Sequence, residues 1–342
     1  NLKCYWIMNK NILVTGGLGY IGSHLCLKLL EKNYNVSIID DLSNSKIDVL
    51  KKIIQISKKK PFFYNFNINN IKKTSTILKK KKIDLVFHLA AFKDVNESIH
   101  KPFKYYDNNI FGMVNLIRSM ESAKKNKLIF SSSAVVYGKS KYLPLDEKHP
   151  TTPLSPYGLT KLFGEKYLDY TSNNKENFKV ISLRYFNPVG SHSSGELGDN
   201  PDRPDNIMPL INKCATRRMN SFKIYGSNYP SKDGTAIRDY IHVLDVVDAH
   251  ISALNNINKF KGHNIFNIGT GKGVTVLEIL NTYKKINDIN FKTRKVGRRK
   301  GDIPISYASV NKIKKYMKWK SKYNLKDMCK SSFNFARKTA VK

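Results

Sequence analysis

The stretch that decides the fold is NILVTGGLGYIG, residues 11–22. Its β-branched first half predicts a buried strand, and the helical pattern of residues 23–31 follows the glycines directly. Glycines at this spacing allow a tight turn, close approach of a pyrophosphate to the backbone, and close packing of helix on strand. Amides at the helix N-terminus add donors for phosphates. The glycines concerned are Gly16, Gly19 and Gly22.

An acidic residue ends the second predicted strand, residues 35–39. Asp40 follows Gly22 by 18 residues, close to the ~20 typical of a carboxylate that binds the adenosine ribose. Such a carboxylate accepts hydrogen bonds from the ribose hydroxyls and repels a 2′-phosphate, so it favours NAD over NADP. Alternatively, Asp40 is a turn residue or a helix cap. We predict an α/β fold built on a Rossmann-type, doubly wound parallel sheet.

Two later predicted strands carry candidate site residues at their carboxyl ends. The apolar run 83–89 is typical of a buried parallel strand, and the small pair Ala90-Ala91 leaves room for a cofactor. His88 fits a core histidine better than a catalyst. The strand 128–131 runs into the triple serine 131–133, where one hydroxyl can donate to a substrate oxygen or simply bond its own turn.

The stretch SPYGLTK, residues 155–161, places a tyrosine four residues before a lysine. On a helix this spacing puts both side chains on one face. An ammonium group near a phenol lowers its pKa from the ordinary value of about 10. Tyr157 is then a candidate proton acceptor for an alcohol that loses a hydride, with Lys161 as its partner. The alternative is a tyrosine and a lysine that only line a helix surface.

Composition bounds the class of protein. The chain has 342 residues, 41% of them hydrophobic and 11% aromatic, which is enough for one large or two modest domains with a buried core. The net charge is +34, but the lysines are spread through the whole chain. A solvated surface that attracts an anionic substrate therefore explains the charge better than a nucleic-acid partner does.

Cysteine usage and hydropathy indicate a protein of a reducing compartment, which we interpret as the cytoplasm. The cysteines Cys4, Cys26, Cys214 and Cys329 fit no metal-ligand spacing, so we expect free thiols and no metal. No apolar run approaches the ~20 residues needed to span a bilayer, and we expect no membrane contact.

The β/α rhythm changes along the chain and suggests the domain boundaries. We interpret residues 1–9 as a leader and residues 10–187 as an NAD-binding domain, to which elements at about 239–269 return in the main sheet. Residues 188–238 and 270–342 would form a smaller substrate-binding lobe.

Seven motifs in order resemble the extended short-chain dehydrogenase/reductases, and among them the UDP-hexose 4-epimerases. The likeness covers about residues 10–320. The motifs are TGGLGYIGSH, DNN at 107–109, SSSAVVYG, SPYGLTK, RYFNPVG, DGTAIRDYIHV and GTGKG. The resemblance implies NAD as cofactor, a UDP-sugar as substrate and inversion at carbon 4, which interconverts UDP-galactose and UDP-glucose. It also implies a homodimer that includes the Tyr157 helix in its interface.

The resemblance assigns roles position by position. Ser133 would donate to the oxygen on carbon 4, Tyr157 would be the acid/base, and Lys161 would bind the nicotinamide ribose and acidify Tyr157. The implied cofactor contacts are Gly16, Gly19, Tyr20, Ile21, Gly22, Asp40, Asn44, Ser45, Asn67, Ile68, Lys93, Asn108, Lys161 and Phe186. The implied substrate contacts are Ser133, Tyr157, Asn187, Asn206, Lys223, Ile224, Tyr225, Arg238, Arg299, Asp302 and Ser306.

The chain departs from the family pattern at two positions. Asn67 replaces a frequent aspartate that contacts adenine, and its carbonyl can still accept from the adenine amino group. Ser306 replaces a bulky tyrosine of bacterial relatives, which suggests that N-acetylated UDP-sugars also fit.

Rival interpretations remain within and outside enzymes. A 4,6-dehydratase is disfavoured because Ala134-Val135, not an acidic pair, follow Ser133. A uronate epimerase or a decarboxylase stays open. A non-catalytic cofactor-sensing or nucleic-acid-binding protein would usually have lost the serine, tyrosine or lysine that this chain keeps.

Overall fold

A parallel sheet of seven strands forms the centre of the fold. The computed structural model describes residues 10–202, 204–299 and 301–340, so the interpretation of residues 1–9 lies outside the described residues. The strand order is β11-β6-β5-β4-β1-β2-β3. The bounds are β1 Asn11–Thr15, β2 Asn35–Ile39, β3 Phe62–Tyr64, β4 Leu85–His88, β5 Lys127–Ser133, β6 Lys179–Tyr185 and β11 His263–Ile268.

The strand order reverses at β1, which pairs in parallel with both β2 and β4. In doubly wound sheets this reversal opens a crevice at the carboxyl ends of the strands, where ligands bind. Val14 and Phe87, partners in neighbouring strands, are fully buried, as a sheet covered by helices on both faces requires. The prediction of a Rossmann-type doubly wound sheet is therefore confirmed.

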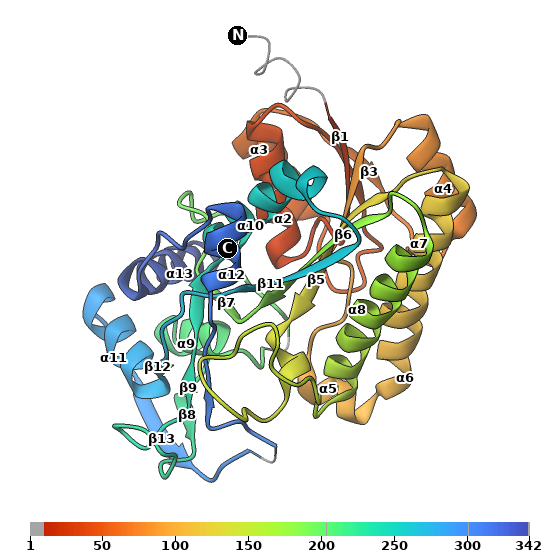
Figure 1. The fold of residues 1–342 in the computed structure, drawn as a ribbon. Coiled ribbons are helices and arrows are strands. Elements are labelled where there is room, and N and C mark those ends of the chain that lie inside the picture. The colour runs from red at the N-terminus through yellow and green to blue at the C-terminus, as the bar shows by residue number, and fades with distance from the viewer. Residues whose placement is uncertain (1–9, 203, 300, 341–342) are drawn as a thin grey trace. The chain divides into compact units, whose positions relative to one another are not determined.

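Helices cover the two faces of this sheet (Figure 1). One face carries α4, α7 and α8, whose buried side chains share one apolar cluster with the sheet. On the other face, α2 packs against both β1 and α3. The bounds are α2 Tyr20–Glu31, α3 Asp48–Ser57, α4 Ile71–Lys80, α5 Val95–His100, α6 Pro102–Tyr105, α7 Gly112–Ser122, α8 Pro156–Asn174 and α10 Val243–Asn256.

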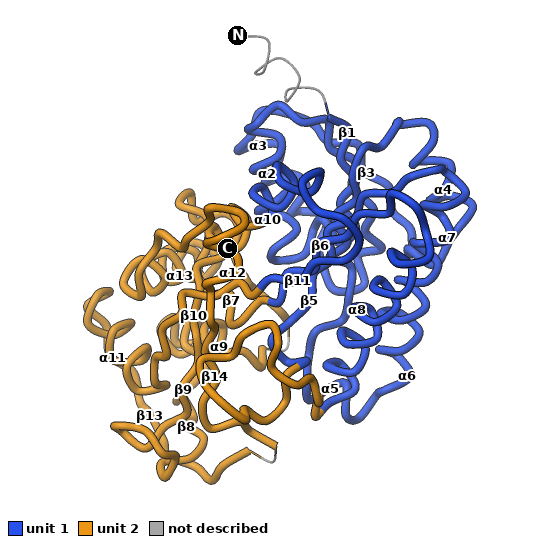
Figure 2. Tube along the Cα trace, viewed as in Figure 1, with its two compact units in different colours: residues 1–136, 155–184, 250–266 blue, residues 137–154, 185–249, 267–342 orange. Residues whose placement is uncertain are grey.

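The chain divides into two compact units (Figure 2). The first contains residues up to 136, 155–184 and 250–266, and the second contains residues 137–154, 185–249 and 267–342. Our prediction that residues 239–253 begin with an element of the main sheet is wrong. β10, Tyr240–His242, pairs with β7, Asn187–Val189, in a separate two-stranded sheet, whereas β11 joins the main sheet as predicted.

Small sheets and helices build the second unit around its own apolar cluster. β12, β9 and β14 form a three-stranded sheet, and β13 pairs with β8 in parallel. The bounds are β8 Ser221–Tyr225, β9 Ile237–Arg238, β12 Val274–Thr275, β13 Lys292–Val296, β14 Ile305–Ser306, α9 Ile207–Ala215, α11 Val276–Asn287, α12 Asn311–Met317 and α13 Leu325–Ala340.

A buried carboxylate explains two of the sequence motifs in this unit. Asp239 is fully buried and accepts hydrogen bonds from the backbone amides of Thr270, Gly271 and Ala308. The RDY and GTG segments therefore meet for a structural reason. No described helix has the length and apolar character needed to cross a membrane.

Candidate active site

The glycine loop connects β1 to α2 as predicted, and two of its glycines cannot be replaced without strain. A Cβ on Gly22 would lie 2.1 Å from the carbonyl oxygen of Gly16. Gly16 has a φ of +69°, and a Cβ there would lie 2.6 Å from the amide of Ala90. Helix α2 begins at Tyr20 with Gly19 as its N-cap, and no side chain caps it. Its first amides are therefore available to an anion.

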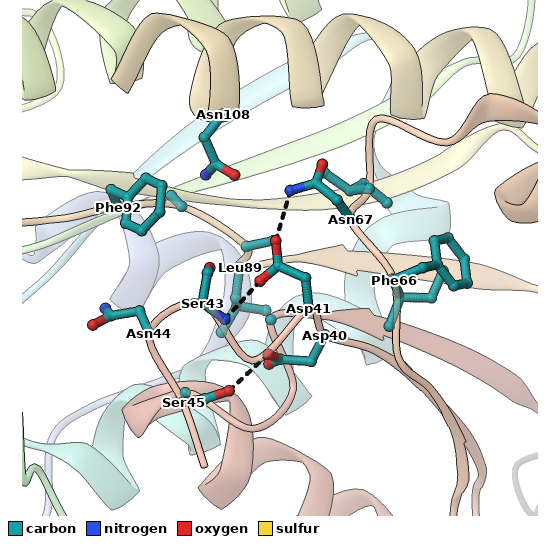
Figure 3. A pocket seen from close by; sticks show the side chains of 16 residues that line it. Asp40, Asp41, Ser43, Asn44, Ser45, Phe66, Asn67, Leu89, Phe92 and Asn108 are labelled. Carbon is teal, nitrogen blue, oxygen red and sulfur yellow. Dashed lines mark hydrogen bonds between the residues drawn. The ribbon is translucent and has the colours of Figure 1, made fainter. Parts of the chain in front are cut away.

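An open pocket lies beside this loop, at the carboxyl ends of β1, β2 and β4 (Figure 3). It has a volume of about 540 Å³, part of it open to solvent. The predicted cofactor residues that line it are Gly16, Gly19, Asp40, Asn44, Ser45, Asn67, Ile68 and Asn108. The lining residues that the sequence did not single out are Ile39, Asp41, Ser43, Phe66, Leu89 and Phe92; Ala90 and Ala91 are the predicted small pair.

Asp40 lines the pocket and also accepts hydrogen bonds from the loops around it. One carboxylate oxygen accepts from the amide of Leu18 at 2.9 Å, and the other accepts from the amide of Leu42 at 3.0 Å and the hydroxyl of Ser45 at 2.7 Å. Asp40 therefore acts as a turn residue, and its predicted contact with a ribose stays a prediction. A carboxylate has about four acceptor positions, so one remains for a ribose hydroxyl.

Asp41 is a pocket residue that the sequence reasoning missed. Burial would raise the pKa of its carboxyl, but hydrogen bonds from Ser43 and Asn67 outweigh that effect and lower the pKa. Asn67 donates its amide to Asp41 at 2.6 Å, and its carbonyl oxygen accepts from the amide of Asn69 at 2.9 Å. The predicted adenine contact of Asn67 would have to share that oxygen. The double aspartate after β2 was the available signal for Asp41.

A π-helical turn, Tyr106–Phe111, carries the two asparagines of the DNN motif. Asn108 lines the pocket and donates its amide to Asn109 at 3.0 Å. Asn109 is buried and bonds both backbone groups of Phe92 and the hydroxyl of Thr160. It therefore ties the pocket wall to helix α8.

The remaining predicted cofactor residues of the first unit lie on α2 and near it. Tyr20 and Ile21 are the first two residues of α2. The Lys93 ammonium lies 5.5 Å from the centre of the Tyr20 ring.

The three predicted catalytic residues come together at the end of β5. Helix α8 starts at Pro156, and its N-cap Ser155 accepts from the amide of Gly158 at 3.1 Å. This cap places Tyr157 in the first turn, where its hydroxyl bonds the side chain of Ser133. One turn later, the Lys161 ammonium donates to the carbonyl oxygen of Ser131 at 2.8 Å.

The electrostatics of this cluster correct one prediction. Burial raises the pKa of Tyr157 to about 12, and the hydrogen bond with Ser133 is the influence that lowers it. The predicted net lowering by Lys161 is therefore wrong. Burial also lowers the pKa of Lys161 to about 7, so its charge is only partial at neutral pH. Desolvation outweighs the charge effect that the sequence suggested.

His88 is a core histidine, as predicted. Its Nδ1 lies 2.7 Å from the hydroxyl of Thr15, and its ring stacks on Phe130. Burial and the charge of Lys161 lower the pKa of His88 to about 3, so it stays neutral at working pH.

Two arginines form the basic part of the predicted substrate site in the second unit. Arg238 pairs with Asp302, which also accepts from the hydroxyl of Tyr229 at 2.9 Å. Arg299 lies 4.0 Å above the centre of the Tyr225 ring and pairs with Asp205 at 3.1 Å. A guanidinium group has five N–H donors, so each arginine retains donors for a phosphate.

The other predicted substrate residues occupy strands and a helix end of the same unit. Ser306 is the register partner of Arg238, and Asn206 is the N-cap of α9. The side chain of Ile224 is buried in the apolar cluster, so a substrate contact at this position would be made by its backbone. Lys223 and Tyr225 flank it on β8, and Asn187 begins β7. Phe186, which was predicted as a cofactor contact, has its ring centre 6.4 Å from that of Tyr137.

The described residues contain no group of three or more histidine, cysteine or acidic side chains suited to a metal. Cys26, Cys214 and Cys329 are buried free thiols, while Cys4 lies outside the described residues.

Comparisons with known proteins identify the family of the chain. The sequence pattern of the NAD dependent epimerase/dehydratase family matches residues 12–269. A UDP-glucose 4-epimerase of Cyamopsis tetragonoloba is 39% identical over 335 residues, which cover 96% of both chains. The crystal structure of UDP-glucose 4-epimerase from Stenotrophomonas maltophila, with NAD and formylated UDP-arabinopyranose, has a TM-score of 0.95 and 38% identity, covering 97% of this chain and 99% of that one.

A second solved structure gives the same result. UDP-glucose 4-epimerase from Bifidobacterium longum, in complex with NAD⁺ and UDP, has a TM-score of 0.92 at 38% identity, covering 96% of this chain and 98% of that one. A match over most of the chain, together with the glycine loop and the Ser133–Tyr157–Lys161 cluster, shows that the chain belongs to the NAD-dependent epimerase/dehydratase family.

Proposed function

We propose that the protein is a UDP-glucose 4-epimerase, an isomerase that interconverts UDP-galactose and UDP-glucose with NAD as its cofactor. The observation that carries this proposal is the contact of Tyr157 with Ser133 beside Lys161, in the unit that also holds the dinucleotide-type loop. The relatives of this length and similarity are UDP-glucose 4-epimerases. Together they support an activity at a sugar hydroxyl.

The residues of the first unit fit NAD. The glycine loop leaves no space for a Cβ at Gly22, and the α2 amides face the same region. Asp40 keeps one acceptor position, and a carboxylate there disfavours a 2′-phosphate. We infer that the first unit is the NAD-binding domain and that the second binds the UDP-sugar.

In the proposed mechanism, Tyr157 exchanges a proton with the oxygen on carbon 4 of the hexose. The single Ser133 hydroxyl proton stabilises the phenolate before substrate binds, and in the complex it would instead be donated to the oxygen on carbon 4. Lys161 holds the end of β5 through Ser131 and contributes positive charge. NAD held by the glycine loop and Asp40 would supply the hydride acceptor and donor for carbon 4.

The second unit would retain the nucleotide while the hexose turns, so that the opposite face of carbon 4 receives the hydride. Arg238 and Arg299, each oriented by a carboxylate, suit the diphosphate. Binding energy from the UDP part holds the intermediate without fixing the sugar ring.

One assay tests this proposal. The purified protein is given UDP-galactose without added NAD, and UDP-glucose is measured; a retained cofactor predicts turnover. Nucleotide released from the denatured protein identifies the cofactor. No turnover, with or without added NAD, would contradict the proposal.

A small side chain at position 306 supports a second substrate class. Ser306 adjoins Arg238 in register, and a hydroxymethyl group leaves more space than a phenol. We propose that UDP-N-acetylglucosamine is also a substrate. Ser306→Tyr should then lower kcat/KM for the N-acetylated sugar much more than for UDP-glucose, and an equal effect on both would contradict this.

We further propose a homodimer that works in a reducing compartment, the cytoplasm. Large apolar side chains are exposed on α8 and on the elements that contact it: Phe103, Phe111, Leu159 and Tyr170. The wide spacing of the cysteines, which fits no metal site or disulfide framework, supports the reducing compartment.

A further inference from the structure

The last three residues of β5 each meet a different residue of helix α8. The Ser131 carbonyl accepts from Lys161 at 2.8 Å, and the Ser132 hydroxyl donates to Glu165 at 2.6 Å. The Ser133 side chain bonds Tyr157. The triple serine is therefore three successive attachments of one strand to one helix.

The helix residues in these contacts are spaced by four, at 157, 161 and 165. That spacing places them on one face of α8, one above the other. A slip of α8 by one residue along β5 would break all three contacts together. The contact farthest from the reacting atoms, at Glu165, thus fixes the same register as the contact of Tyr157 with Ser133.

Glu165 is held more firmly than its neighbours on this face. Its side chain is 3% exposed and receives two parallel hydrogen bonds from Arg184, at 2.8 and 2.7 Å. Arg184 lies on β6, the neighbour of β5 in the sheet, and is 4% exposed. The carboxylate therefore joins α8 to two strands, and a bidentate pair of this kind fixes orientation as well as distance.

We propose that Glu165 is a positioning residue of the reaction, which holds α8 in the register where Tyr157 meets Ser133 and whose carboxylate sustains the positive charge of Lys161. The proposal rests on the proposed function, since it assigns Tyr157 and Lys161 to the chemistry. It assigns no contact with substrate or cofactor to Glu165.

The charged and titratable groups around Lys161 support the second part of the proposal. Glu165 and Tyr157 face it from α8, His88 faces it from β4, and Arg184 on β6 lies behind Glu165. Burial lowers the pKa of Lys161 to about 7, and Glu165 is the group that raises it. His88 is neutral above pH 4 because its pKa is about 3. Glu165 is therefore the carboxylate that favours the protonated form of Lys161 against the effect of burial.

The variant Glu165→Gln tests the charge at nearly constant shape. We expect the alkaline limb of the kcat profile, where Lys161 loses its proton, to move about one pH unit lower. At a pH on that limb kcat should fall about tenfold, while KM for UDP-galactose stays within about twofold. The variant Ser132→Ala keeps both charges and removes one hydrogen bond, so it should lower kcat without moving the limb.

Two further variants separate positioning from stability. Leu168→Ala truncates a fully buried side chain on the same helix, so it should lower Tm and leave the pH profile unchanged. Glu165→Gln/Arg184→Gln removes both buried charges, so neither remains unpaired if the single variant fails to fold. In this double variant the alkaline limb of the kcat profile should move by the same amount as in Glu165→Gln.

The outcomes decide between the proposals. If Glu165→Gln or the double variant has the wild-type profile and kcat while Tm falls, Glu165 is only structural and the inference is overturned.

If the wild type itself has no epimerase activity, the proposed function fails. The link from Glu165 to Lys161 is then measured without substrate, from the pH dependence of urea unfolding with and without Lys161→Met. The link is supported if Glu165→Gln changes the pH dependence of unfolding in the wild type but not in Lys161→Met. It is overturned if Glu165→Gln changes the pH dependence equally in both backgrounds.

Discussion

At the scale of single residues, burial governs the chemistry of the site. Tyr157 and Lys161 lie on one face of α8 as the sequence predicts, yet desolvation raises the pKa of the phenol and lowers that of the amine. The phenol therefore depends on Ser133 for stabilisation of its anion. Such effects depend on how much protein surrounds a group, which residue spacing does not reveal.

Tyr157→Phe removes the proton acceptor and leaves the ring in place. We expect kcat to fall by a factor of about 10²–10⁴, the usual contribution of a positioned acid/base. The Kd for UDP should change little, because the predicted nucleotide contacts lie on other residues. Steady-state assays and calorimetric titration with UDP measure both; wild-type turnover would refute the role of Tyr157.

The pKa of Lys161 has a consequence for stability. Its value is about 7 in the folded protein, against about 10.4 in an unfolded chain. Between these values the unfolded state binds more protons, so this residue makes stability rise with pH from about 7 to about 10. In Lys161→Met that contribution is absent. Urea unfolding at pH 7 and pH 9 should show a smaller rise for the variant, and equal slopes would contradict the buried amine.

At the scale of secondary structure elements, the β1–α2 connection has a strict steric requirement at Gly22. A Cβ at Gly22 would overlap the Gly16 carbonyl at 2.1 Å, whereas one at Gly19 would lie 3.4 Å from it. Gly22→Ala should therefore lower Tm and release bound NAD, and Gly19→Ala should be folded with a Tm close to that of the wild type. Thermal melts and cofactor content measure this. Equal effects at the two positions would contradict the packing argument.

The elements also show what the sequence could and could not predict. Strong local patterns predicted β1 and α2, which flank the glycine turn, and β4, which lies in a near-continuous apolar run. No pattern identified in the sequence predicted the π-helical turn Tyr106–Phe111. Asp41, Asn109 and Glu165 were missed because their roles depend on partners distant in the sequence.

At the scale of the whole molecule, the net charge of +34 creates a field that attracts anions. The association of a UDP-sugar should therefore weaken with ionic strength. We expect KM for UDP-galactose to rise at least threefold between about 50 and 500 mM salt, with kcat nearly constant. A flat KM would show that the lysines act only as solvated surface.

The exposed apolar side chains around α8 allow a test of the homodimer. Phe111 and Tyr170 are 55% and 71% exposed, and a charge at each should weaken association. Phe111→Glu/Tyr170→Glu should elute as a monomer in light-scattering chromatography, while Phe62→Glu, at a 50% exposed position on β3, should not change the elution. A dimer that tolerates both charges would place the interface elsewhere.

Neither compact unit is a continuous piece of polypeptide, since the chain leaves the first after residue 136 and re-enters it at residues 155 and 250. Neither unit can be expressed as one continuous fragment. A fragment ending at residue 136 lacks β6 and β11, the two strands at one edge of the central sheet. During synthesis, the nascent chain therefore exposes the edge of β5 until β6 has been made. We expect the first unit to reach its native state only after β11, its last strand, has been made.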